Sequence, residues 1–357
     1  MNLSRLVLGI ALLSFAITGV AKKGGGNGDG KPGEGEDVPI NAAFVLASAF
    51  RRDNTDVYVV DVGGTLEKRI SRASKFWGQA MPTVWSADAT KFIWTPREDL
   101  SIHLSNPDGT GEQIIVPATE EMYPWIGGQR NLAPADRGCD GSSANLLYFL
   151  GQFPKRESGM EEMFVVDLDD PGASIQLTDN QSERFSTIAL SPDGRLIATW
   201  AFPSPGHSWS EGALQIRDAC DPETIFYSWT ASDLGQVEGF VYFARIDWSV
   251  TDLLAVSGHE FPGGDGYDDL WLIDLNVENP VATKIIGDGT GFGEGADNRR
   301  PTWSPDGTKL AFVSSNQAGA SDYDLCILDT TTGEISNIGR VGEVRDLDWR
   351  STWAATP

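Results

Sequence analysis

The chain has 357 residues and a formal net charge of −24, from 27 Lys and Arg against 51 Asp and Glu. This excess of negative charge repels phosphate groups and therefore excludes nucleic acid as a natural partner. Hydrophobic residues make up 40% of the chain and charged residues 22%, a composition typical of a globular protein rather than of a disordered one.

The N-terminal residues lack the pattern of a folded domain. Residues 1–21 combine Arg5 with an apolar run and with small residues at 19–21, which predicts a signal peptide that is cleaved on export. An uncleaved membrane anchor is the alternative. Residues 22–41 are rich in Gly and charged residues, and we expect a flexible linker there.

The first strands of the chain form an incomplete sheet. Residues 42–48, 56–62 and 66–70 read as three strands with no innermost strand before them. At the other end of the chain, 344–349 reads as an innermost strand with no second strand after it. We therefore expect 344–349 to join the N-terminal sheet, because this pairing closes a ring of sheets and removes their exposed edges.

The clearest repeated unit is 301–329. Its turn, Ser304-Pro305-Asp306-Gly307, suits a tight hairpin, since Pro favours the first central position and Gly the left-handed residue. Weaker copies begin near Trp85, Leu190 and Trp248. The anchor positions 190, 248, 303 and 349 are 58, 55 and 46 residues apart, which is the spacing of repeated four-stranded sheets.

These repeats predict an all-β fold, a six-bladed β-propeller over residues 42–351, with 352–357 as a C-terminal tail. The first blade is the one closed by the N- and C-terminal strands. The other five blades are expected at about 82–116, 131–179, 186–229, 240–288 and 300–340.

The motif Trp303-Ser304-Pro305-Asp306-Gly307, followed by Leu310-Ala311-Phe312 and by the strand 324–329, resembles the PD40 (WD40-like) repeat of TolB-type propellers. The match is clear in the blades at 186–229 and 300–340. The resemblance implies a propeller fold, but propellers of this kind include periplasmic scaffolds, gating domains of serine peptidases and a few lyases. Where TolB-like proteins carry an α/β domain, this sequence has only the linker, which argues against a specific role in the Tol system.

Several residues are candidates for a site at the mouth of the propeller channel. His207 and His259 occupy equivalent loops between second and third strands, and Asp265 and Asp268 follow the second of them. One interpretation is a ligand or divalent-cation pocket, and the other is a pair of polar loops. Arg299 directly precedes an innermost strand, so its side chain is a candidate anion contact at the same mouth.

Two further features belong to this face. Trp125 lies in a connection between blades, where an aromatic side chain suits contact with protein or sugar, although packing between blades is the alternative. The connection 287–300 is Gly-rich and acidic, so it has the ligands for a calcium ion, but a flexible connection explains it equally well.

The three cysteines divide into two kinds. Cys326 lies between apolar residues within a strand, and we expect it to be buried. Cys139 and Cys220 lie in loops of neighbouring blades that emerge on the same face. A disulfide between these two is allowed if the chain is exported, and the sequence leaves the pairing open.

The sequence therefore predicts an exported, acidic and monomeric propeller, periplasmic or secreted, that binds a protein or small ligand of the cell envelope without catalysing a reaction. We expect no catalytic residues, since no Gly-x-Ser-x-Gly motif stands in a strand–turn–helix context. No cofactor is expected other than the calcium ion considered above. The alternative function is a hydrolase or lyase assisted by a divalent cation at the channel mouth.

Overall fold

The computed structural model describes residues 43–51, 54–61, 67–69, 83–96, 99–106, 110–124, 132–153, 161–179, 182–203, 211–235, 240–260, 268–286, 297–315 and 323–349. The predicted signal peptide, linker and C-terminal tail lie outside these ranges. Within them every regular element of the backbone is a β-strand, and none forms a helix with the length and apolar character needed to cross a membrane.

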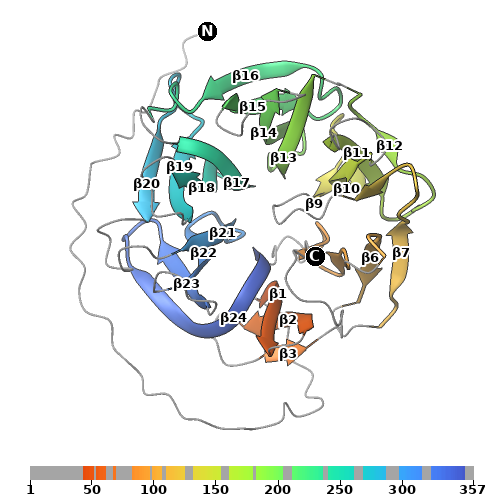
Figure 1. Cartoon of the computed structure of the whole chain (residues 1–357), viewed down its shortest axis with the longest axis horizontal. Coiled ribbons are helices and arrows are strands. Elements are labelled where there is room, and N and C mark those ends of the chain that lie inside the picture. The colour runs from red at the N-terminus through yellow and green to blue at the C-terminus, as the bar shows by residue number, and fades with distance from the viewer. Residues whose placement is uncertain are drawn as a thin grey trace.

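The strands form five antiparallel sheets that stand around a common centre (Figure 1). Four of the sheets follow the chain in order. They are β4 (Thr83–Trp85), β5 (Phe92–Trp94), β6 (Ile102–Ser105) and β7 (Gln113–Val116); β8 (Tyr123–Pro124), β9 (Leu132–Arg137), β10 (Ser143–Gln152), β11 (Glu161–Asp167) and β12 (Ile175–Gln176); β13 (Glu183–Leu190), β14 (Leu196–Pro203), β15 (Ala213–Asp218) and β16 (Ile225–Thr230); β17 (Phe240–Trp248), β18 (Leu253–Glu260), β19 (Asp268–Asp274) and β20 (Ala282–Ile286).

The fifth sheet joins the two ends of the described chain. It contains β21 (Asn298–Trp303), β22 (Lys309–Ser314), β23 (Tyr323–Asp329), β24 (Ile335–Trp349), β1 (Ala43–Arg51), β2 (Asn54–Asp61) and β3 (Glu67–Arg69). The end of β24 pairs with β1, with Phe44 opposite Trp349. The predicted pairing of the N- and C-terminal strands is therefore confirmed.

The count of six separate blades is not confirmed. The described strands form five sheets, because β24 is one continuous strand of 15 residues. Its first half, up to Gly342, pairs with β23, and its second half, from Glu343, pairs with β1. Two blades that the repeat spacing treats as separate are thus joined in one sheet of seven strands.

The innermost strands close a ring. Contacts run from the end of β24 to β4, then through β9, β13 and β17 to β21, which returns to β24. Aspartates of these strands tie neighbouring sheets together: Asp247 accepts the backbone N–H of Trp303 (2.7 Å), and Asp348 accepts that of Trp85 (2.9 Å). Both carboxylates directly precede a Trp, so the same sequence feature makes the same contact at two places.

A buried ion pair joins strands of different sheets in the ring. Arg245 of β17 is fully buried and pairs with Asp346 of β24, whose other oxygen accepts the backbone N–H of Thr83 at 2.7 Å. The guanidinium also donates to the carbonyl oxygen of Leu347. The pair therefore links β17 to β24, two strands of the ring.

Aromatic side chains fill the space between neighbouring sheets. The edge of the Phe243 ring meets Trp200 with the ring centroids 5.1 Å apart, and Trp271 packs in the same core. Gly212 precedes β15 beside this core, and a Cβ atom there would lie 2.3 Å from Nε1 of Trp200. The absence of a side chain at 212 is what lets the indole pack here.

The turns after four innermost strands, β4, β13, β17 and β21, share one feature, a closing residue in the left-handed conformation. The Ser304 hydroxyl donates to Asp306 (2.6 Å) and accepts the backbone N–H of Lys309 (2.9 Å), and the pKa of Asp306 is lowered chiefly by the bond from Ser304. Ser191 and Ser86 make the same bonds. The closing residue has a positive φ in every copy: Gly307 (70°), Gly194 (72°), Ala89 (55°) and Asp252 (58°).

We expect Gly194→Ala to lower the free energy of unfolding by about 1–2 kcal/mol, because a positive φ disfavours every residue with a Cβ. The added Cβ would also lie 3.0 Å from the carbonyl oxygen of Arg137. Gly172→Ala is the control, since the nearest atom to its Cβ would be 3.9 Å away. Urea unfolding measures both, and equal stabilities of the two variants would contradict this explanation of the turn.

Candidate functional site

Two of the predicted site residues, Asp268 and Arg299, lie on the same face of the ring. Neighbouring strands of an antiparallel sheet run in opposite directions, so the first and third strands of a sheet begin on the same face. We call this the entry face. Asp268 is the first residue of the third strand β19, and Arg299 is the second residue of the innermost strand β21. The structure brings these two residues together.

Four residues from neighbouring sheets form what we call the Arg299 cluster: Asp268, Asp297, Arg299 and Tyr323. Nε of Arg299 lies 2.6 Å from Oδ1 of Asp297 and 3.4 Å from Oδ2 of Asp268. The Tyr323 hydroxyl donates to the other oxygen of Asp297 at 2.6 Å. The Arg299 side chain remains 35% exposed, whereas the Asp297 side chain is 5% exposed. The cluster therefore combines a buried carboxylate with a partly exposed Arg side chain.

The electrostatics of the cluster fix its protonation. Burial lowers the pKa of Arg299, but the carboxylates of Asp268 and Asp297 outweigh it and leave the pKa above its ordinary value. Burial raises the pKa of Tyr323, and the Asp297 carboxylate raises it further against the opposing effect of Arg299. The site therefore presents a charged guanidinium and a neutral phenol at any physiological pH.

An equivalent pair lies at another junction between sheets. Arg184, the second residue of β13, donates from Nε and Nη2 to the two oxygens of Glu161, the first residue of β11, at 2.8 Å each. Burial raises the pKa of Glu161, although Arg184 opposes the shift. Arg184 therefore stands in its sheet where Arg299 stands in β21, and Glu161 stands where Asp268 stands in β19.

Glu161 and Asp268 are each followed directly by a second acidic residue. Glu162 accepts a hydrogen bond from the Thr178 hydroxyl (2.6 Å), and Asp269 forms an ion pair with Lys284 (2.8 Å). In both sheets the first acid contacts the next sheet, and the second contacts the outer part of its own sheet. Sequence reasoning missed the Glu161–Arg184 pair: the acidic doublet at the start of β11 is visible in the sequence, but the partner of its first acid is not.

Of the remaining predicted residues, the structure describes only the backbone of His259. His207, Asp265 and Trp125 lie outside the described residues. The backbone of His259 is described in β18, where it stands opposite Asp268 in the register. Two of the predicted positions on the entry face are thus neighbours in one sheet.

A metal centre finds no support in the described ranges. They contain no group of three or more His, Cys, Asp or Glu side chains placed to hold a metal ion. The two carboxylates of the Arg299 cluster already neutralise a guanidinium, which makes them poor ligands for a second cation.

We therefore expect dialysis against a chelator to leave the melting temperature unchanged, and calcium to have no effect when it is added back. A thermal scan under the three conditions makes the measurement, with magnesium as the control for nonspecific ion effects. A rise in melting temperature with calcium alone would contradict this expectation and would favour a site in the acidic connection 287–300.

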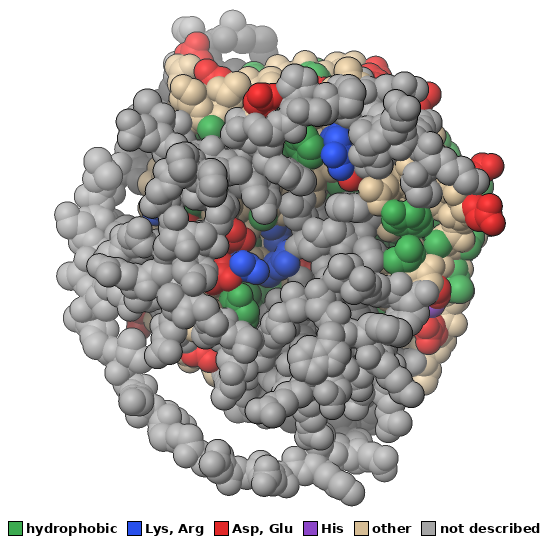
Figure 2. All heavy atoms as spheres, in the orientation of Figure 1, with side chains coloured by type: hydrophobic (Ala, Val, Ile, Leu, Met, Phe, Trp, Pro, Cys, Tyr) green, Lys and Arg blue, Asp and Glu red, His purple; other side chains and the backbone are tan. Residues whose placement is uncertain are grey.

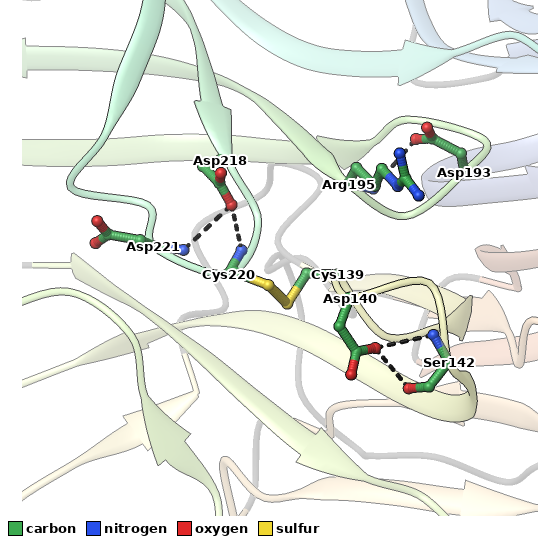
Figure 3. Close-up of a disulfide and its surroundings, with 8 residues drawn as sticks. All are labelled: Cys139, Asp140, Ser142, Asp193, Arg195, Asp218, Cys220 and Asp221. Atoms are coloured by element: carbon green, nitrogen blue, oxygen red, sulfur yellow. Dashed lines mark hydrogen bonds between the residues drawn. A yellow bond between two sulfur atoms is a disulfide. The ribbon is translucent and has the colours of Figure 1, made fainter.

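A disulfide lies on the opposite face. Cys139, between β9 and β10, is bonded to Cys220, between β15 and β16, with their Cα atoms 5.2 Å apart (Figure 3). The backbone N–H of Cys220 donates to Asp218 at 2.7 Å, which holds its loop in place. This is the pairing that the sequence left open, and it joins two neighbouring sheets. Cys326 is a buried free thiol, and burial raises its pKa.

Figure 2 shows the charged side chains on one face of the described residues. Basic side chains stand beside acidic ones near the middle of that face, while acidic side chains are scattered along its periphery.

Comparisons with known proteins concern the fold. No known protein-family profile matches the sequence, and no curated protein sequence matches it either. Among solved structures, TolB from Acinetobacter baumannii is 17% identical with a TM-score of 0.58, over 86% of this chain and 66% of that one. A TolB from Agrobacterium tumefaciens, described as putative, is 13% identical with a TM-score of 0.51, over 85% of this chain and 92% of that one.

Propellers with other roles are similar to a comparable degree. A chain of a nidogen–laminin complex is 9% identical with a TM-score of 0.56, over 88% of this chain and 100% of that one. Puromycin hydrolase is 16% identical with a TM-score of 0.52, over 84% of this chain but 52% of that one. At these identities the likeness concerns architecture alone. From its repeats, its ring of sheets and these neighbours, the described chain has the fold of a TolB-type β-propeller.

Proposed function

We propose that this protein is an exported propeller that binds a protein or small ligand of the cell envelope through its entry face, without catalysing a reaction. The Arg299 cluster carries the proposal. In this cluster the partly exposed, charged side chain of Arg299 is held in place by the carboxylates of Asp268 and Asp297. A preorganised cation of this kind suits the recognition of a carboxylate or phosphate group.

Several features of the chain support a binding role. The neighbour from the nidogen–laminin complex is a propeller solved together with a protein partner. The signal sequence at 1–21 and the TolB-like fold favour a periplasmic or secreted location and a mature chain without a membrane anchor.

The ring is proposed to count six blades rather than five. In this proposal the seven-stranded sheet acts as two blades that share β24, whose first half serves as an outer strand and whose second half serves as an inner strand. The pairing of the two halves with different neighbours supports it. Under this proposal, an insertion near Gly342 that interrupts β24 would leave its first half paired with β23 and its second half paired with β1.

The test is capture of a partner from envelope extract with the exported form of the chain. Arg299→Gln should abolish capture of the partner. Trp125→Ala should reduce the amount captured, although this change removes no charge. Arg195→Gln is the matched control, because Arg195 lies in the turn after β13 on the face opposite the entry face. Equal capture by all variants, or capture of nothing by the native chain, would contradict the proposal.

A further inference from the structure

The outer strand β16 differs from the other rim strands in length and exposure. It lies at the outer rim of its sheet (Figure 1), pairs with β15 on one side, and has no described strand on the other. It has six residues, whereas the other rim strands β20, β7, β3 and β12 have five, four, three and two. Its edge is therefore long enough to pair with a further strand.

The side chains of β16 are apolar and exposed. Ile225, Phe226 and Tyr227 are 42%, 50% and 59% exposed, and the Tyr227 ring stacks on Trp229 with the centroids 5.2 Å apart. Natural proteins protect exposed edges with charged residues, Pro or bulges. Here the strand contains no charged residue and no Pro, and a register shift near Phe226 is the one such device.

The charges at the two ends of β16 indicate which kind of chain can bind along its edge. Asp221 and Glu223 precede the strand, and Asp233 follows it, so both ends are acidic. The pKa of Asp233 is lowered by hydrogen bonds from Thr230, which keeps it ionised. An antiparallel second copy would place the acidic start of one β16 against the acidic end of the other, and each copy carries a net charge of −24.

We propose that β16 binds an extended segment of a partner protein that adds to this sheet as a fifth strand. The segment would carry apolar or aromatic side chains at alternate positions, to lie beside Tyr227 and Trp229 on one face of the sheet, and Lys or Arg at both ends, to face Glu223 and Asp233. Backbone hydrogen bonds would supply the affinity, and the aromatic contacts and charges the specificity. This surface is separate from the entry face, so it stands independently of the function proposed above.

Two synthetic peptides and the exported form of the chain provide the test. Both peptides contain the same alternating Val, Tyr and Thr core, one between pairs of Lys and the other between pairs of Glu. We expect the Lys-flanked peptide to bind, with an affinity that falls as salt rises, and the Glu-flanked peptide not to bind. Hydrogen exchange should show new backbone protection at 225–230.

Variants locate the site. Tyr227→Lys should weaken binding of the Lys-flanked peptide about tenfold, because it removes an aromatic contact and adds a repelling charge. Ile175→Lys is the matched control, since Ile175 is 63% exposed on the rim strand β12. Both variants change surface positions, and circular dichroism will check that they fold.

Four outcomes would overturn the proposal. Equal affinities for the two peptides would show that charge does not select the ligand. Equal losses of affinity for Tyr227→Lys and Ile175→Lys would show that the peptide does not bind at β16. A native chain that sediments as a dimer and becomes monomeric on Tyr227→Lys would show that a second copy is the occupant. Absence of binding by either peptide would also count against it.

Discussion

Replacing Asp346 with Ala should lower the free energy of unfolding by about 3–5 kcal/mol, the cost of breaking a buried ion pair from one side. The Arg245 guanidinium is fully buried, and it would lose its carboxylate. The backbone N–H of Thr83 would lose its acceptor at the same time. The change therefore affects three inner strands of the ring, β17, β24 and β4. Urea unfolding followed by tryptophan fluorescence measures the loss.

A double variant serves as the control for this prediction. Arg245→Met combined with Asp346→Leu removes both charges, so no unpaired ion is buried, and apolar side chains of similar size fill the space. We expect the double variant to be more stable than either Asp346→Ala or Arg245→Met alone, which is a coupling between the two positions. Additive losses would show that the two side chains do not stabilise the ring as a pair.

Loss of the disulfide should have an effect of similar size. The bond closes a loop with a sequence separation of 81 residues between Cys139 and Cys220. In the chain-entropy description, a loop of this length destabilises the unfolded chain by about 4.5 kcal/mol at 25 °C. We expect Cys139→Ser with Cys220→Ser to lower the free energy of unfolding by about 3–4 kcal/mol, measured by urea unfolding without reductant.

Reductant separates this effect from repacking at the two serines. It should destabilise the native chain and leave the double variant unchanged, because Cys326 has no partner with which to form a bond. Alkylation of the unfolded, unreduced native chain should modify Cys326 alone. Modification of all three thiols would contradict the pairing.

The sequence predicted the features that depend on local chemistry. The turns at Ser304 and Ser191 were evident from Pro and Gly at fixed positions, and the weaker copies at Ala89 and Asp252 adopt the same left-handed conformation. The pairing of the first and last strands was predicted because the first sheet lacked an inner strand. Each of these inferences uses a pattern that a short stretch of chain carries by itself.

Features that depend on neighbouring sheets were not predicted. The Arg245–Asp346 and Arg184–Glu161 pairs join residues of different sheets, and nothing in the local sequence indicates which acid each Arg meets. The continuity of β24 was also missed, because the spacing of repeats does not show whether two blades share a strand. Asp268 and Arg299 were predicted separately, and their contact follows from the ring.

The shared strand also bears on how this chain reaches its native state. The pairing of Phe44 with Trp349 cannot form until nearly all of the described chain has been synthesised. Until then β1 offers an open side to any other extended chain, and a fragment that stops before Glu343 would keep that side open. Nascent or truncated molecules should thus be the aggregation-prone species, and holdase chaperones would be expected to engage the N-terminal strands.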